Sequence, residues 1–200
     1  MSTHLLNRRR YRPGTTLKVT EGLELSLGRA HEACGPARVS FALWLAAVSP
    51  GPVLWISAAW SQEQLNPAGI LEFADPSRFL FARANSRDDQ LWALEEGLRA
   101  GVAPLVVADL DHPPALTPVR RLHLAAEQGG QQGMPPLAVL LTPGEGGAAG
   151  IESRWQLHPS HQGQHRIWHL QRLRARSLPP ASWHLQQEAP GQPLRPCPPP

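Results

Sequence analysis

The sequence predicts an α/β fold built on a mostly parallel β-sheet. Short runs of almost entirely apolar residues alternate with longer stretches whose apolar residues have helical spacing. Strands that are apolar throughout are typical of a parallel sheet covered on both faces, because neither face meets water. Two hundred residues are enough for one such core. After residue 142 the pattern changes, and residues 152–157 and 165–173 are predicted to form an antiparallel hairpin at the edge of the sheet.

The expected elements follow one another in strict alternation. In chain order they are strand 25–34, helix 36–48, strand 53–56, short helix 66–71, strand 78–82, helix 86–101, strand 105–108, helix 117–129 and strand 137–141. The clearest helix begins at Ser86, which forms a capping box with Asp89, and it ends at Gly101. Thr117 and Pro118 are expected to be the cap and the first residue of the last helix. This order predicts a three-layer core with helices on both faces of the sheet.

Composition divides the chain into three parts. Residues 1–19 form a basic N-terminal segment, residues 20–176 the core with its hairpin, and residues 177–200 a proline-rich tail that we expect to be disordered or in polyproline II conformation. Four arginines lie within residues 1–12 without an acidic residue, and six arginines within residues 154–200 face one glutamate. Residues 13–153 contain nine basic and fifteen acidic residues. Basic ends on an acidic body suit contact with nucleic acid or an acidic partner, although they also suit simple solubility.

The sequence predicts no secretory signal, no membrane span and no structural disulfide. The basic N-terminus is not followed by the apolar segment of a secretory signal, and no run of about 18 apolar residues could cross a membrane. Cys34 and Cys197 lie in a loop and in the tail, so a structural disulfide between them is not expected. We therefore expect a cytoplasmic protein that does not contact a membrane.

The turn after the first strand resembles a phosphate-binding loop without its chemistry. A Walker-type loop needs backbone amides, a lysine on the β- and γ-phosphates and a serine or threonine for Mg²⁺. Here Gly35 and Pro36 begin the loop, but the only lysine of the chain, Lys18, lies upstream of the strand. Arg38 is the one residue that could replace the lysine, and an ordinary solvated arginine in the first helical turn is the favoured interpretation.

Two further strand ends support this interpretation. An ATPase of this architecture would place a carboxylate after the second strand, but Ser57 and two alanines stand there and Glu63 lies several residues away. Asp109 ends a later strand, where a Walker B aspartate would hold Mg²⁺, and a role in the following turn is the simpler alternative. We predict that the chain is not an enzyme and needs no cofactor, and that Gly35, Pro36, Arg38 and Asp109 are vestigial.

Histidines and tryptophans offer weaker candidates. His158, His161, His165 and His169 cluster in the hairpin without the spacing of a zinc site, so polar decoration is favoured over metal binding. Trp55, Trp60 and Trp92 are expected in or near the core. Three other tryptophans lie among arginines at the basic end, where either stacking on bases or packing within the hairpin would explain them; they are Trp155, Trp168 and Trp183.

Several segments together resemble one protein family. They are Gly28-Arg29 with Glu32 and Gly35-Pro36, residues 64–67 (QLNP), residues 90–101 (QLWALEEGLRAG) leading to Asp109, residues 119–127 (VRRLHLAAE) and residues 153–155 (SRW). In this order they resemble ImuA, the RecA-like accessory protein of bacterial damage-induced mutagenesis, which is also related to the cell-division inhibitor SulA. The resemblance covers about residues 20–185, and its two helical segments are the more specific part.

The resemblance implies a RecA-like core and a role in SOS-induced translesion synthesis. The implied partners are the polymerase-like protein ImuB and, further, RecA and an error-prone DNA polymerase, with DNA contacts through the basic ends. Residues that we expect to serve such contacts are Arg120, Arg121, Arg154, Trp155, Trp168, Arg172, Arg174 and Arg176. Two alternatives stay open, namely a weak ATP-binding switch that uses Arg38 and Asp109, and a SulA-like inhibitor of cell division.

Overall fold

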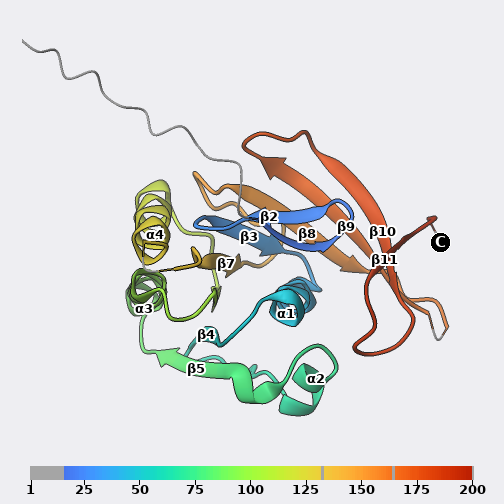
Figure 1. The fold of residues 1–200 in the computed structure, drawn as a ribbon, viewed down its shortest axis with the longest axis horizontal. Helices are drawn as coiled ribbons and strands as arrows, with labels where there is room; N and C mark the ends of the chain where they lie inside the picture. Colours follow the sequence, from blue (N-terminus) through green and yellow to red (C-terminus); the bar gives the residue numbers. More distant parts are fainter. Residues whose placement is uncertain (1–15, 132, 164, 200) are drawn as a thin grey trace, which may run out of the picture.

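A nine-stranded sheet organises the chain in the computed structural model, which describes residues 16–131, 133–163 and 165–199 (Figure 1). The strands lie in the order β11-β10-β9-β8-β3-β7-β6-β4-β5. Their bounds are β3 Ala30–Cys34, β4 Val53–Ala58, β5 Phe79–Ala84, β6 Leu105–Asp109, β7 Leu137–Leu141, β8 Ser153–Pro159, β9 Arg166–Ala175, β10 Ala181–Gln187 and β11 Arg195–Cys197. Strands β3 to β8 pair in parallel, whereas β9, β10 and β11 are antiparallel to their neighbours. The prediction of an α/β fold with a mostly parallel sheet is confirmed.

Helices cover both faces of the parallel part of the sheet. Helix α1 (Arg38–Val48) and a separate hairpin of β1 (Thr16–Thr20) and β2 (Leu23–Ser26) pack on one face. Helices α3 (Arg87–Ala100) and α4 (Leu116–Gly129) lie side by side on the other face, away from β9 to β11 (Figure 1). Each face has its own apolar cluster, because alternate residues of the buried strands point to opposite sides.

Between β2 and α1, element boundaries differ from the prediction at two places. The stretch 25–34 is not one strand, because a turn with Gly28 at φ 69° separates β2 from β3. Helix α1 begins two residues after Pro36, with Ala37 as its N-cap. The short helix α2 (Pro67–Leu71) begins as expected, since the Asn66 side chain accepts a hydrogen bond from the Ala68 amide. None of the helices in the described residues is long and apolar enough to cross a membrane.

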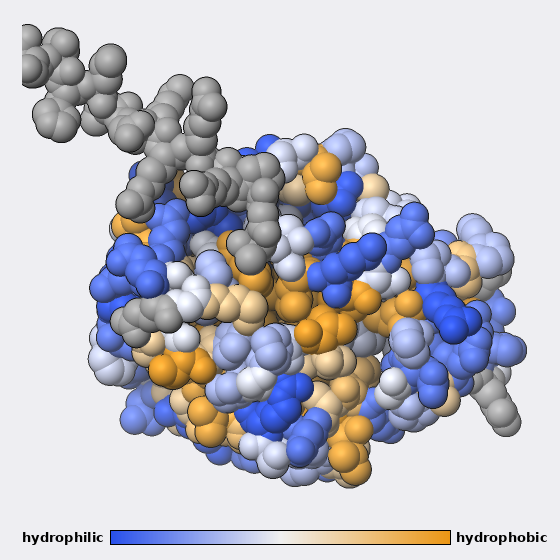
Figure 2. All heavy atoms as spheres, in the orientation of Figure 1, coloured by the Kyte–Doolittle hydropathy of each residue, from blue (hydrophilic) through white to orange (hydrophobic). Residues whose placement is uncertain are grey.

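The prediction of a disordered tail from residue 177 is wrong. Strand β10 pairs along its full length with β9, and β11 pairs with β10. The side chains of Leu185 and Leu194 are buried in the cluster on the α1 face, although prolines surround them in the sequence. The hairpin of β8 and β9 is confirmed, but it continues the sheet between β3 and β10 rather than ending it. Hydrophilic side chains prevail on the visible surface of this end of the molecule (Figure 2).

Helix α3 has the cap that the sequence predicts, whereas α4 does not. The Ser86 side chain accepts a hydrogen bond from the Asp89 amide at 3.1 Å and donates one to the Asp89 carboxylate at 2.8 Å. Helix α4 has Ala115 at its N-cap without a side-chain hydrogen bond, so Thr117 already lies inside the helix. We expect Ser86→Ala to lower the free energy of unfolding by about 1 kcal/mol. Thr117→Ala is the matched control and should change it by less than about 0.5 kcal/mol in urea unfolding; equal losses would contradict this assignment of the caps.

Candidate functional site

The loop that follows β3 is closed onto the protein. The Gly35 amide donates to the Gly144 carbonyl at 3.0 Å, the Ala37 amide to the Leu157 carbonyl at 3.1 Å, and Pro36 has no N–H. Gly35 has φ 87°, and a Cβ at this position would lie 2.7 Å from the Leu157 carbonyl oxygen, so only glycine fits here. These loop amides therefore do not form the open cradle that a phosphate group needs.

Arg38 and Asp109 meet at the carboxyl ends of the parallel strands. Arg38 is the first residue of α1, Asp109 the last of β6, and Arg38 Nε lies 3.6 Å from Asp109 Oδ1. Both side chains are 23% exposed. Burial raises the pKa of Asp109; Arg38 partly offsets this effect and the nearby Glu63 carboxylate adds to it. The candidate substitute for the loop lysine and the candidate Walker B aspartate thus form one ion pair.

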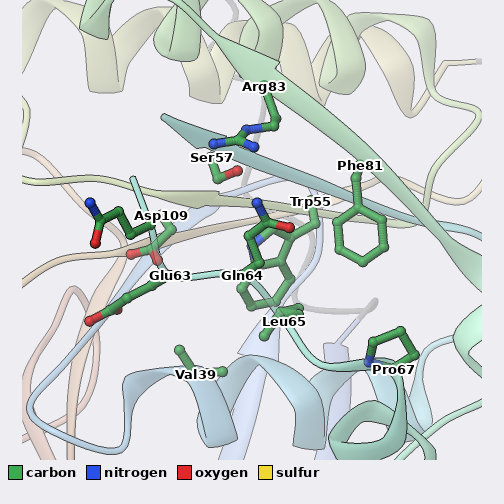
Figure 3. Close-up of a pocket in the computed structure, with 11 residues that line it drawn as sticks. Val39, Trp55, Ser57, Glu63, Gln64, Leu65, Pro67, Phe81, Arg83 and Asp109 are labelled. Carbon is green, nitrogen blue, oxygen red and sulfur yellow. The ribbon is translucent and has the colours of Figure 1, made fainter. Parts of the chain in front are cut away.

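A cleft of about 770 Å³ opens beside this pair (Figure 3). Its lining comes from α1, from the ends of β4, β5 and β6, and from residues 62–67, which connect β4 to α2. Asp109 and Glu63 lie at one end, and the rings of Phe81 and Pro67 at the other. Glu63 comes several residues after the end of β4 in the sequence, but the connection folds back and brings it to the carboxyl ends of the strands. Arg83 points into the cleft but donates to the Ala59 and Ser61 carbonyls, so it fixes the connection.

The loop that follows β7 is held by a buried carboxylate whose role no sequence pattern indicates. Glu32 of β3 is fully buried and accepts hydrogen bonds from Thr142 Oγ1 at 2.7 Å, from the Gly147 and Ala148 amides, and from Arg154 Nε at 2.5 Å. Arg154, expected to contact a partner, is therefore engaged inside the molecule. Nearby, burial raises the pKa of the Cys34 thiol to about 12, so this thiol is not a nucleophile at neutral pH.

Two of the three tryptophans for which stacking on bases and packing within the hairpin were both open are core residues. Trp155 and Trp168 are only 1% and 2% exposed. The guanidinium of Arg172 lies over the rings of Trp155 and Trp183, at 5.5 and 5.2 Å, and its Nε donates to the Pro179 carbonyl. Burial lowers the pKa of this arginine. Of the two interpretations of Trp155 and Trp168, packing within the hairpin is the one the structure realises.

The remaining predicted arginines lie on helix α4 and at the end of β9. Arg120 and Arg121 are exposed on α4, where Arg121 pairs with Glu95 of α3 at 2.5 Å. Arg174 and Arg176 are exposed at and just after the end of β9. The basic residues of segment 1–12 lie outside the described residues.

The structure also places the three tryptophans expected near the core and the histidines of the hairpin. Trp55 is buried as expected, but Trp60 and Trp92 are 52% and 61% exposed. His158 and His169 face each other across β8 and β9. Within residues 16–131, 133–163 and 165–199, three or more histidine, cysteine or acidic side chains are nowhere arranged to hold a metal ion.

The cleft, and not the loop of Gly35, is the part of this site that is open to a ligand. The Gly35 and Ala37 amides donate to protein carbonyls, Arg38 pairs with Asp109, and the cleft combines aromatic walls with the carboxylates of Asp109 and Glu63. Such a cleft of mixed polarity can bind a side chain or a small ligand without chemical change. No protein-family model matches the sequence, and no curated protein matches it either.

Proposed function

We propose that this chain is a non-catalytic, RecA-like adaptor that helps to assemble a translesion-synthesis complex on damaged DNA. Its partner would be an ImuB-like polymerase homologue, with RecA and an error-prone polymerase as further contacts. The biological setting comes from the resemblance of residues 90–101, 119–127 and 153–155 to ImuA. The mostly parallel sheet, with the loop of Gly35 between β3 and α1, is compatible with the RecA-like architecture.

One observation supports the non-catalytic part of this proposal above the others. The amides of Gly35 and Ala37 donate to protein carbonyls at 3.0 and 3.1 Å, and a phosphate would have to break both hydrogen bonds. The Gly144 and Leu157 carbonyls would then lose these donors, and a buried backbone polar group left without a partner costs about 1–3 kcal/mol. The loop therefore favours its own protein contacts over a nucleotide, and hydrolysis would additionally lack the loop lysine and the Mg²⁺ hydroxyl.

Calorimetry with MgATP separates the adaptor from an ATP-dependent switch. The switch is the second candidate because Asp109 and Glu63 lie at one end of the cleft and Arg38 pairs with Asp109. For the adaptor we expect no heat of binding at millimolar MgATP and no phosphate release. Magnesium-dependent heat that Asp109→Asn abolishes, while the melting curve stays unchanged, would establish the switch instead.

Partner capture tests the adaptor itself. Tagged chain should retain the polymerase-like homologue from DNA-damaged cells, and the two purified proteins should bind each other directly. Overexpression without DNA damage should leave septation normal. Filamentous cells under that condition, together with no binding to the purified homologue, would favour the SulA-like alternative.

A further inference from the structure

Helices α3 and α4 touch at their C-terminal ends and leave a groove toward their N-terminal halves. Gly129 of α4 lies against the backbone of Leu98 and Gly101, where a Cβ would be 2.1 Å from the Leu98 carbonyl oxygen. Toward the other end, the two helices border a groove of about 430 Å³. It is lined by Asp88, Asp89, Leu91, Trp92, Glu95, Pro118, Arg121 and Leu122. Both helical segments that carry the resemblance to ImuA thus border this groove.

An exposed indole stands in the groove. Trp92 is 61% exposed, although Leu94 and Leu98 on the same helix are fully buried. Tryptophan is among the residues that most often dominate the binding energy of protein interfaces. Leu124 of α4 is 64% exposed as well. The fold does not need these two side chains for its core, so their apolar surface is free to be covered by a partner.

The charge of the groove selects a basic partner. Arg121 pairs with Glu95 at 2.5 Å, and Glu95 also pairs with Arg99, so these charges compensate one another within the protein. Asp88 and Asp89 remain beside Trp92 and are exposed to solvent. A lysine or arginine of a partner would meet these carboxylates and could also lie over the indole ring.

We propose that this groove is the docking site for a basic, amphipathic helix of the polymerase-like partner. The helix would bury a large apolar side chain against Trp92 and place a lysine or arginine beside Asp88 and Asp89. A helix that lies between two helices is an established way to recognise a peptide. The inference rests on the proposed adaptor function and specifies the surface and the chemistry of the contact.

Binding measurements with the purified polymerase-like homologue test the groove. Trp92→Ala and the double variant Asp88→Lys/Asp89→Lys should each bind at least 10-fold more weakly than the unmodified chain. Trp60→Ala, at another exposed tryptophan, and Glu21→Lys/Glu188→Lys, at exposed acids elsewhere, are the matched controls and should stay within 2-fold. The pair Asp88→Asn/Asp89→Asn repeats the test without placing positive charge at the N-terminus of α3. Melting curves check that every variant is folded.

The outcomes distinguish the groove from the adaptor function. If the unmodified chain does not bind the homologue, both the proposed adaptor function and the proposed docking groove are overturned. Binding that is normal in the groove variants overturns the groove alone. A photo-crosslinker at position 92 should join a partner segment that contains lysine or arginine next to a large apolar residue, and an acidic segment would overturn the proposed chemistry. A dimer that Trp92→Ala dissociates would identify the groove as a contact between copies and overturn the proposal.

Discussion

Replacing Glu32 by alanine should lower the free energy of unfolding by about 3–5 kcal/mol, because the substitution removes one partner of a buried ion pair. The carboxylate is fully buried, and Arg154 Nε donates to it at 2.5 Å. Without it, the Arg154 guanidinium, the Thr142 hydroxyl and the amides of the following loop lose their acceptor. Urea unfolding followed by circular dichroism measures the change.

An exposed acid in the same loop provides the control. Glu145→Ala should change the free energy of unfolding by less than about 0.5 kcal/mol, since its side chain is in solvent. Glu32→Gln keeps the size of the side chain but cannot accept all of the same hydrogen bonds, so it should fall between the two. If Glu32→Ala cost no more than Glu145→Ala, the carboxylate would not be what holds the loop against β3.

The sequence was sufficient where local chemistry determines the structure. Ser86 caps α3, and Gly101 ends it at φ 66°, because both depend only on residues within one or two helical turns. The apolar runs of β4, β6 and β7 likewise needed no knowledge of their neighbours to be recognised as buried strands. The proximity of Arg38 and Asp109 could also be predicted from the sequence, since parallel strands bring their carboxyl ends to one edge of the sheet.

Long-range pairing explains what the sequence did not reveal. Strand β10 exists because residues 181–187 pair with β9 and bury Leu185, and the surrounding prolines gave the opposite local signal. Glu63 joins Asp109 only because the connection after β4 folds back, and this path has no sequence signature. Trp92 and Trp155 are equally apolar in sequence, so only the packed structure tells the exposed indole from the buried one.

Replacing Gly129 by alanine should destabilise the protein, although helix propensity alone predicts the opposite. In an open helical position alanine is about 1 kcal/mol more favourable than glycine. At Gly129, however, the added Cβ would stand 2.1 Å from the Leu98 carbonyl oxygen, which is backbone and cannot turn aside. Helix α4 would have to move away from α3, and we expect a loss of about 2–3 kcal/mol in urea unfolding.

Gly69 is the matched control because it lies in the middle of α2 with nothing within 4 Å of its Cβ position. Gly69→Ala should leave stability unchanged or raise it by up to about 1 kcal/mol. The opposite signs of the two substitutions separate packing from propensity. Since the contact at Gly129 sets the spacing of α3 and α4, Gly129→Ala should also weaken binding at the groove beside Trp92. A variant that is as stable as the unmodified chain would show that the two helices separate freely, and the groove would then have no fixed shape to recognise a partner helix.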